Sequence, residues 1–469
     1  MRYAFRFGER LKFATLGAAL ALVASCSSVT DSLLEVEDPD LIAPENTNSA
    51  AGAIAVANGA LGRLNDVTTG DESTWLFGGL LADEWGTSST FIQNDEADWR
   101  KVQDNNSSVG GMLRRLYRVR TAANQAIKLL NEWQPTRTAL RAEMYFARGF
   151  AELQLASDYC NGIPISDGTE IEIVFGEPET TQEVFNRAIA SFDSALAIVG
   201  TATDAASVRV ARAARVGKAR AQLGNNQFAA AATTIGGTTG VPTTFAYQTT
   251  SSLAADDNII WNQGLSARRY SVADSLEGNS RNLLVRNAIP FFSARDPRLP
   301  VTDTRTVGQD GGTFVRTTTL YDRLTPIDVV SGLDARLIEA EAALRGGNAA
   351  QWLQILNDLR TGPTRITQVG TVVLAATALP PLTDPGTTEA RVSLHFREKA
   401  FWTFSRGQRL GDLRRLVRQF GRTPDNVFPV GPHYKTSAYG TDVNFPIHPD
   451  ELNNTNLQGK TQVCIDRNA

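Results

Sequence analysis

Histidine is one of the rarest residues in this 469-residue chain, which contains only His395, His433 and His448. The three are far apart and show neither the H-E-x-x-H nor the His-x-His spacing of a metal site. The chain also lacks a G-x-S-x-G nucleophile elbow and a G-x-x-x-x-G-K phosphate loop. These absences predict no metal centre and no cofactor, and we expect the protein not to be an enzyme.

Acidic pairs are the remaining candidates for catalysis, because two carboxylates can carry out the acid and base steps of glycoside hydrolysis. A chain with 50 acidic residues offers many such pairs, and pairs on helices usually form a solvated face. We therefore expect these pairs to be solvated rather than catalytic. The pairs are Asp83/Glu84, Asp256/Asp257 and Glu339/Glu341.

The chain has no excess of positive charge and no long apolar run. Its formal net charge is −4, whereas a protein that neutralises nucleic-acid phosphates needs a basic surface. Beyond the N-terminus, no segment approaches the roughly 18 uncharged apolar residues that predict a membrane-spanning helix. The sequence thus argues against nucleic-acid binding and against an integral membrane protein.

The N-terminus has the parts of a bacterial export signal. A cationic start precedes an uncharged apolar run over residues 13–24, which is shorter than the about 20 residues that a spanning helix needs. The run ends in Val-Ala-Ser-Cys, which resembles the lipobox of bacterial lipoproteins, where the cysteine becomes the acylated N-terminus. An ordinary signal peptide with an incidental cysteine is the alternative. We predict that residues 1–25 are removed and that Cys26 carries lipid.

Only three cysteines occur, and Cys160 and Cys464 remain beside the predicted lipidation site. In an oxidising compartment outside the cytoplasm, an even pair predicts a disulfide. The bond would close a loop of about 300 residues and hold the C-terminal tail. Two buried thiols are the alternative. Since no C-x-x-C pair is present, a redox-catalytic role is not indicated.

Helical periodicity runs through much of the chain, with apolar residues at steps of three, four and seven. One segment begins with Thr180 or Thr181 as its N-cap, has Glu183 shortly after it and ends at Gly200. Two others divide at Gly-Asn-Asn and Gly-Gly-Asn turns into helix pairs, which resemble tetratricopeptide repeats with irregular spacing. The predicted helical segments are 113–133, 138–159, 181–199, 208–235 and 334–360.

Long segments without helical periodicity interrupt these helices. They are rich in Gly, Thr, Asp and Pro, and loops longer than about 15 residues in a compact domain are usually functional. No Pro-, Gly- or Ser-rich linker separates domains. We predict a mainly α-helical protein in which residues 26–48 are a lipidated tether and residues 49–469 are one domain of helix pairs with long loop insertions. The insertions are 66–107, 236–330 and 361–390.

Two of these insertions contain aromatic residues beside amides and charged side chains. An aromatic ring can stack on the apolar face of a sugar while polar neighbours bind its hydroxyl groups. The alternative is that the rings anchor the loops in the core, because tryptophan is mostly buried, and Trp75 beside Leu76 and Phe77 is the first core candidate. The predicted ligand-binding residues are Trp85, Asn94, Trp99, Trp261, Arg268 and Tyr270.

Several short segments follow the lipobox in a distinctive order. LEVEDPDLIAPEN and YRVRTAANQAI come first, then RAEMYFARGFAELQLASDYCNGIPI with its Gly-x-Pro turn, and then FFSARDPRL. The LIEAEAALRGGN…LNDLR hairpin, FREKAFWTFSRGQRLGDLRRL and NFPIHPDELNNTNL close the series. This set resembles the SusD/RagB family of outer-membrane nutrient-capture lipoproteins over nearly all of the mature chain. The tail differs from the family's Asn-Pro-Gly-Tyr-like ending.

The resemblance implies a helical body of four tetratricopeptide-like helix pairs whose loop insertions bind an oligosaccharide or a similar nutrient. It also implies a lipid anchor in the outer membrane, facing the cell exterior, and a SusC-like TonB-dependent transporter as partner. An envelope repeat scaffold without a small-molecule ligand is one alternative, and an exported hydrolase is another. The aromatic insertions favour a binding protein over a scaffold, and the missing nucleophile or metal constellation disfavours a hydrolase.

Overall fold

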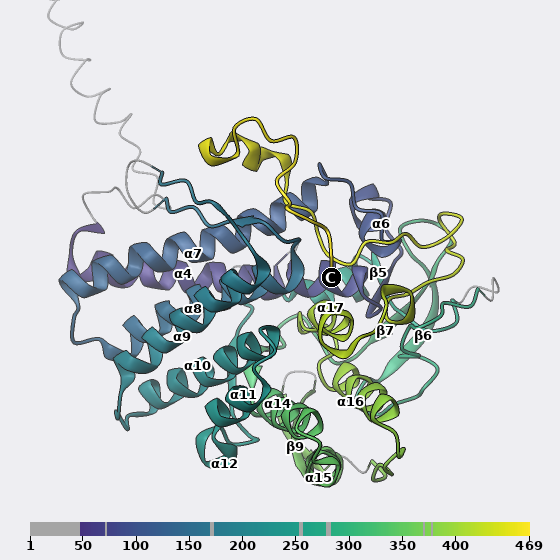
Figure 1. Cartoon of the computed structure of the whole chain (residues 1–469). Coiled ribbons are helices and arrows are strands. Elements are labelled where there is room, and N and C mark those ends of the chain that lie inside the picture. The colour runs from purple at the N-terminus through teal and green to yellow at the C-terminus, as the bar shows by residue number, and fades with distance from the viewer. Residues whose placement is uncertain are drawn as a thin grey trace, which may run out of the picture. The chain divides into compact units, whose positions relative to one another are not determined.

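Helices make up most of the described chain in the computed structural model (Figure 1), so the predicted mainly α-helical fold class is confirmed. The structure describes residues 47–70, 73–168, 173–252, 257–277, 283–368, 371–376 and 379–469, and for 363–368 and 371–376 it describes the backbone alone. The predicted signal peptide, Cys26 and nearly all of the predicted tether lie outside the described residues, as does Asp256. Residues 50–469 form one unit, described below.

Five long helices form one side of this unit and lie next to one another in Figure 1. α7 and α8 are joined by a short connection, as are α9 and α10, so each pair is antiparallel. α4 packs along α7, and α8 packs between α7 and α9. These helices confirm the predicted segments in this part of the chain. Their bounds are α4 Ala50–Thr69, α7 Ser107–Trp133, α8 Thr138–Asp158, α9 Thr181–Val199 and α10 Ala205–Gly224.

Side-chain caps begin α7, α9 and α10, whereas α8 begins without one. The predicted cap at Thr180 is confirmed: its hydroxyl accepts from the Glu183 N–H at 3.3 Å, and Glu183 accepts from the Thr180 N–H at 2.8 Å. α7 begins earlier than the predicted residue 113, because the Asn106 side chain accepts hydrogen bonds from two backbone N–H groups of the first turn. The glycine pair near that turn interrupts the apolar pattern, and for this reason the sequence prediction missed the start of the helix.

A second group of helices follows α10. α11 packs against α10 and α14, and α14 and α15 form the predicted hairpin at the Gly-Gly-Asn turn. α14 also contacts α16, while α17 contacts α8 and so joins the two groups. The bounds are α11 Phe228–Ile235, α12 Gly237–Gly240, α14 Gly332–Arg345, α15 Ala349–Thr361, α16 Thr388–Trp402 and α17 Arg409–Phe420.

Buried ion pairs join these helices, and they correct the prediction for the acidic pairs. Asp83, Glu84 and Glu341 are buried rather than solvated. Arg409 donates to both oxygens of Asp83 at 2.6 and 2.9 Å, and Arg415 donates to Glu341. Since charged groups are buried only when they are paired or neutralised, the charge-rich sequence of α17 belongs to the core. Further buried pairs are Lys399–Asp412, Arg406–Asp334 and Arg298–Glu398.

The predicted loop insertion 66–107 is largely regular structure, so that prediction is wrong for most of the segment. It contains the end of α4, the buried helix α5, the short strand β1 and the helix α6. Trp75, on α5, is fully buried, as predicted. The apolar run around it forms a helix too short to show an amphipathic period, which is why the sequence pattern missed it. The bounds are α5 Thr74–Leu81, β1 Trp85–Thr87 and α6 Ile92–Asp98.

The other two insertions contain short antiparallel strand pairs. β5 of the second insertion pairs with β1 of the first, and β4 pairs with β8 and β6 with β7; in the third, β9 pairs with β10. β2 and β3 form a further pair after α8. The bounds are β2 Ile163–Pro164, β3 Pro178–Glu179, β4 Ala246–Thr249, α13 Ile259–Trp261, the π-helical turn η1 Asn262–Ser266, β5 Tyr270–Val272, β6 Val301–Val307, β7 Phe314–Thr318, β8 Ile327–Ser331, β9 Pro363–Gln368 and β10 Thr371–Ala376.

The C-terminal segment returns to the end of α8. Cys160 and Cys464 form a disulfide with their Cα atoms 5.9 Å apart. Beside it, the Cys160 N–H donates to the Phe445 carbonyl at 2.8 Å, and the Ile465 N–H donates to the Asn161 carbonyl at 2.8 Å. The tail also contains the short 3-10 turns 424–426, 449–453 and 455–457. The described helices include none with the length and apolar character needed to cross a membrane.

Candidate ligand-binding site

One pocket lies where three distant parts of the chain meet: β1 with the end of α6, the strands β5 and β7, and the C-terminal loop 429–439. We call it the aromatic pocket. Its interior is about 70 Å³, whereas small-molecule sites usually offer about 300 Å³ or more. It can therefore hold only part of a ligand, with the rest over its rim. The side chains that define it are Trp85, Asp98, Phe314, Arg316, Tyr434 and Tyr439.

The floor of the pocket is set by the pairing of β1 with β5. Trp85 lies opposite Val272, and Thr87 lies opposite Tyr270. The Thr87 N–H donates to the Asp98 Oδ2 at 2.9 Å, which fixes the end of α6 against β1. The strand pair and the helix therefore hold the Asp98 carboxylate at the pocket wall.

One wall of the pocket is a cluster of rings from the C-terminal loop. His433 stacks on Tyr434 with ring centroids 4.8 Å apart and meets Tyr439 edge-on at 4.9 Å. Trp99 also contacts this cluster, edge-on to His433 with ring centroids 6.2 Å apart. The His433 Nε2 lies 3.2 Å from Asp98 Oδ2. This polar contact and the ring contacts join the loop to α6.

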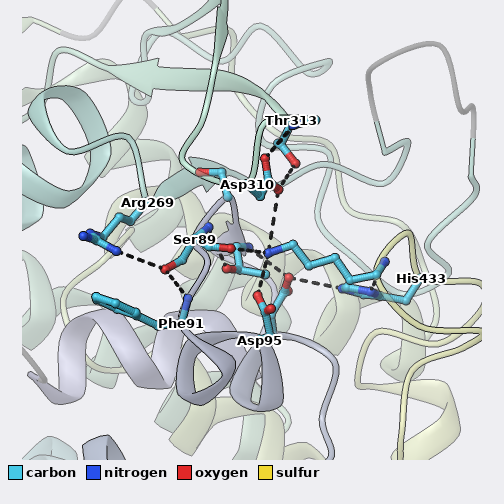
Figure 2. Close-up of polar contacts among 12 residues, drawn as sticks. Ser89, Phe91, Asp95, Arg269, Asp310, Thr313 and His433 are labelled. Atoms are coloured by element: carbon cyan, nitrogen blue, oxygen red, sulfur yellow. Dashed lines mark hydrogen bonds and ion pairs between the residues drawn. The ribbon is translucent and has the colours of Figure 1, made fainter.

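Figure 2 shows a polar network beside this wall. Ser89, Asp95 and Asp310 lie around one side-chain ammonium group, and His433 lies at the edge of the network. Lys435 Nζ donates there to the Ser89 carbonyl and to Asp95, both at 2.6 Å, and lies 3.7 Å from Asp310. One ammonium group thus connects the C-terminal loop to α6 and to the turn between β6 and β7. Burial raises the pKa of Asp95, although its hydrogen bond with Lys435 acts in the opposite direction.

The turn between β6 and β7 is itself held by Asp310. Its carboxylate accepts from the Thr313 hydroxyl at 2.6 Å and from the backbone N–H groups of Gly312 and Thr313 at 3.0 and 2.9 Å. Burial acts to raise the pKa of Asp310, but these hydrogen bonds lower it below its ordinary value. Asp310 is therefore ionised at neutral pH and keeps Thr313 at the pocket.

The polar lining of the aromatic pocket combines carboxylates and hydroxyl groups with one guanidinium group, that of Arg316. Besides Asp98, the lining includes Asp274 and Glu277. Burial raises the pKa of Tyr434 and of Tyr439 well above 10, and the charge of Asp98 adds to both shifts. Both tyrosines therefore stay neutral and can donate or accept a hydrogen bond. Aromatic faces beside carboxylate acceptors suit a ligand that has apolar C–H faces and many hydroxyl donors.

Two of the sequence-predicted ligand residues lie in the core, which corrects their expected role as exposed stacking surfaces. Trp85 is 2% exposed and Tyr270 is 1% exposed, and their ring centroids are 6.4 Å apart. The Trp85 Nε1 donates to the Ser405 hydroxyl at 3.0 Å, and the ring packs 5.0 Å from Phe404. Trp85 contributes to the pocket floor without offering an open face. Asn94, on the inner side of α6, is also buried.

The other three predicted residues are half-buried and lie apart. Trp99 follows α6 and contacts His433. Trp261 is on α13 and packs against the core. Arg268 has a left-handed backbone with φ 54°, and its carbonyl accepts from the Ser88 hydroxyl at 3.0 Å. The structure thus brings Trp85 and Tyr270 together and connects Trp99 to the pocket wall, but the six residues do not form one platform.

The sequence prediction missed the aromatic residues of the C-terminal loop. Tyr434 and Tyr439 are far along the chain from the insertions, although the aromatic content of GPHYKTSAYG over residues 431–440 is a signal that could have found them. Phe91 is one of the aromatic residues of the first insertion but is not among the six predicted ligand residues; it is 51% exposed at the start of α6 and carries the Arg269 guanidinium 4.1 Å from its ring centroid. Figure 2 shows Phe91 and Arg269 beside Ser89, at the edge of the network.

The described residues contain no group of three or more histidine, cysteine or acidic side chains arranged to hold a metal ion. The carboxylates of the aromatic pocket have partners within the protein: Asp83 is paired with Arg409, and Asp98 with His433. Asp274 accepts from the Ser293 hydroxyl at 2.9 Å. The arrangement offers stacking and hydrogen bonding to a ligand.

The arrangement of helices and strands in this chain is the SusD-like fold, by comparison with solved structures. A SusD superfamily protein from Bacteroides fragilis superposes with a TM-score of 0.61 at 13% identity, over 88% of this chain and 99% of its own. A protein described as a SusD-like carbohydrate binding protein, from Bacteroides vulgatus, gives 0.56 at 14% identity over 87% and 97%.

The B. fragilis protein NanU gives a TM-score of 0.58 at 14% identity, over 91% of this chain and 99% of its own. A scan against protein-family models finds no match, and neither does a search of curated proteins. The similarity is therefore one of fold, and it spans nearly the whole length of these solved proteins. The fold of these solved proteins agrees with the resemblance of the sequence segments to the SusD/RagB family.

Proposed function

We propose that this protein is a lipid-anchored binding protein of the outer membrane that captures an oligosaccharide at the aromatic pocket and delivers it to a SusC-like TonB-dependent transporter. The observation that carries the proposal is the pocket itself, where half-buried rings and carboxylate acceptors from distant segments meet. A sugar would place one edge inside the small pocket and lie over the surrounding rim.

The chemistry of the pocket supports a neutral sugar as ligand. Ring faces such as that of Phe314 stack on sugar C–H groups, and the carboxylates of Asp98 and Asp274 accept hydrogen bonds from hydroxyl groups. Arg316 lies 3.8 Å from Asp274 and offsets its charge, but the carboxylates of the lining outnumber this one guanidinium group, so the pocket favours a neutral ligand over an anionic one. The fold supports the same class, because one of the solved proteins that it resembles is described as carbohydrate binding.

The proposed location and partner rest on the sequence. Cys26 follows an export signal at the lipobox position, and several acyl chains anchor a protein stably whereas one does not. A tethered binder cannot move its ligand across the membrane, so capture is useful only with an importer. Confinement to the membrane plane raises the effective concentration of the two partners. A transporter of the SusC type is the partner that the family resemblance implies.

Calorimetry of the detergent-solubilised lipoprotein with a panel of neutral oligosaccharides tests the binding function. Phe314→Ala should weaken binding about five-fold, since a stacking contact contributes about 1 kcal/mol. Phe175→Ala is the matched control, because Phe175 is an exposed phenylalanine outside the pocket. A protein that binds none of the sugars, or equal losses in both variants, would count against the aromatic pocket. An absence of any ligand would favour the envelope scaffold.

Affinity purification tests the partner separately. A tagged copy extracted in mild detergent and analysed by mass spectrometry should bring down a TonB-dependent barrel in stoichiometric amount. Cys26→Ala should reduce this recovery, because the unanchored protein loses its effective concentration beside the barrel. A protein that always purifies alone, even after crosslinking in intact cells, would contradict the delivery role while leaving sugar binding open to the calorimetric test.

A further inference from the structure

A second, larger groove runs along the C-terminal turns of α4, away from the aromatic pocket. It consists of two adjoining cavities of about 690 and 360 Å³, which share Arg63, Asn65 and Asp66 as lining residues. One cavity extends toward β4 and the other toward α7, which lies beside α4 in Figure 1. We call it the α4 groove. Its size is in the range of small-molecule sites, about 300–1,000 Å³.

Among the residues that the structure describes, three arginines line the smaller cavity, together with a single acidic residue, Asp66. Arg63 comes from α4, while Arg115 and Arg118 lie three residues apart on one face of α7. Within the described part of the chain, none of the three forms an ion pair, whereas their neighbours on α7 do: Arg114 with Asp450 and Arg120 with Glu152. In a chain with a net charge of −4, such a group of guanidinium groups is a local basic site.

Glycines keep this groove open. A Cβ at Gly70 would lie too close to the Asp66 carbonyl oxygen and within 2.7 Å of Arg115 Nη1, so a side chain there would clash with the backbone and displace the guanidinium. Gly59 and Gly62, which lie within α4 rather than at its ends, line the larger cavity, and a Cβ at either position would meet nothing within 4 Å. Glycine lowers helix stability relative to alanine, and no internal contact requires these two. They widen the groove on its solvent side.

The larger cavity is lined by further polar groups, which are either uncharged or already paired with an opposite charge. Arg209 is paired with Glu143 at 2.5 Å and lies 4.8 Å above the Tyr247 ring, so its charge is already balanced. Gln248 and Thr250 also line the cavity. Amide and hydroxyl groups of this kind bind sugar hydroxyls, and guanidinium groups bind carboxylates and phosphates in bidentate pairs.

We propose that the α4 groove is a second binding site, for an acidic sugar whose carboxylate or phosphate lies on Arg63, Arg115 and Arg118 and whose hydroxylated ring lies against the cavity beside β4. The proposal is independent of the function of the aromatic pocket, whose carboxylates favour a neutral ligand. The shared chemistry is an oxyanion on a polyhydroxylated body, which a uronic acid or a sugar phosphate supplies.

Titration of the detergent-solubilised lipoprotein with D-glucuronate, glucose 6-phosphate, D-glucose and inorganic phosphate, followed by calorimetry or NMR, tests the proposal. We expect at least one acidic sugar to bind more tightly than both glucose and inorganic phosphate, with an affinity that falls several-fold as salt is raised. Preference for glucuronate identifies a carboxylate ligand, and preference for glucose 6-phosphate identifies a phosphate ligand. Binding of inorganic phosphate as tight as that of the acidic sugars would overturn the role of the sugar body.

Variants locate the site. Arg115→Gln should weaken binding of the acidic sugar about ten-fold, whereas Arg137→Gln, which removes an exposed arginine before α8, should leave it unchanged. Gly62→Leu should also weaken binding without changing any charge, because the new side chain would occupy the larger cavity. Equal effects of Arg115→Gln and Arg137→Gln, or no binding by any acidic sugar, would overturn the proposal. Circular dichroism confirms that each variant is folded.

Discussion

Glu84 provides a quantitative test of the buried charge network. Its side chain is 1% exposed, and its Oε1 accepts from the Ser405 N–H at 2.8 Å. Burial raises the pKa of Glu84 from 4.5 to about 8; the hydrogen bond from Ser405 opposes this rise, and the nearby charge of Asp83 adds to it. The carboxyl group is therefore largely protonated in the folded protein at neutral pH.

The direction of the pH effect follows from which state holds the proton more tightly. Between pH 4.5 and about 8, the unfolded chain has lost a proton that folded Glu84 keeps, so the folded state loses stability as the pH rises through this window. Below the window both states are protonated, and above it both are ionised. From about pH 5 to about pH 8, this group alone lowers the free energy of unfolding by about 3 kcal/mol, at about 1.4 kcal/mol per pKa unit.

Glu84→Gln retains a carbonyl acceptor for Ser405 and removes the ionisation. Relative to wild type, the free energy of unfolding of this variant should rise by about 3 kcal/mol between about pH 5 and about pH 8, measured by urea unfolding followed by circular dichroism. Taking the difference removes the contributions of other groups that titrate in both proteins. Glu132→Gln, an exposed change on α7, is the control and should run parallel to wild type. Parallel curves for Glu84→Gln and wild type would refute the assignment of a protonated Glu84.

Three further predictions concern the disulfide, α4 and the anchor. Replacing both Cys160 and Cys464 by serine should lower the free energy of unfolding by about 2–5 kcal/mol; an unchanged urea midpoint would contradict a stabilising role. Gly62→Ala should raise stability by about 0.5–1 kcal/mol, because the added Cβ meets nothing within 4 Å and alanine favours the helix; destabilisation would mean that the glycine is needed by the fold. Cys26→Ala should abolish incorporation of a clickable palmitate in cells, and equal labelling of variant and wild type would disprove lipidation at this residue.

The helical body could be predicted from the sequence because its signals are local. The run beginning after Thr180 has both a capping box and an apolar period, and the structure forms the helix at the predicted residues. The predicted helical segments do not include α17, and the burial of its arginines was not predicted either. Arg409 and Arg415 are buried because Asp83 and Glu341 meet them from other elements, and such long-range pairing has no local signature.

The candidate site was predictable only in part, for the same reason. The sequence indicated the segment around Trp85 and the strand containing Tyr270, and these two rings do lie together. Pairing of β1 with β5 buries both, which residue types and spacing alone could not reveal. Tyr434 and Tyr439 reach the pocket through tertiary folding from the far end of the chain, so no periodicity or neighbouring motif connects them with Trp85.

A crystal structure of the protein with the neutral oligosaccharide that binds most tightly tests the central claim most directly. The account predicts a sugar edge inside the aromatic pocket, with the ring face against Phe314 or Tyr434 and hydroxyl groups within hydrogen-bond distance of Asp98. A sugar bound at full occupancy elsewhere on the protein, with the aromatic pocket unchanged, would contradict the account.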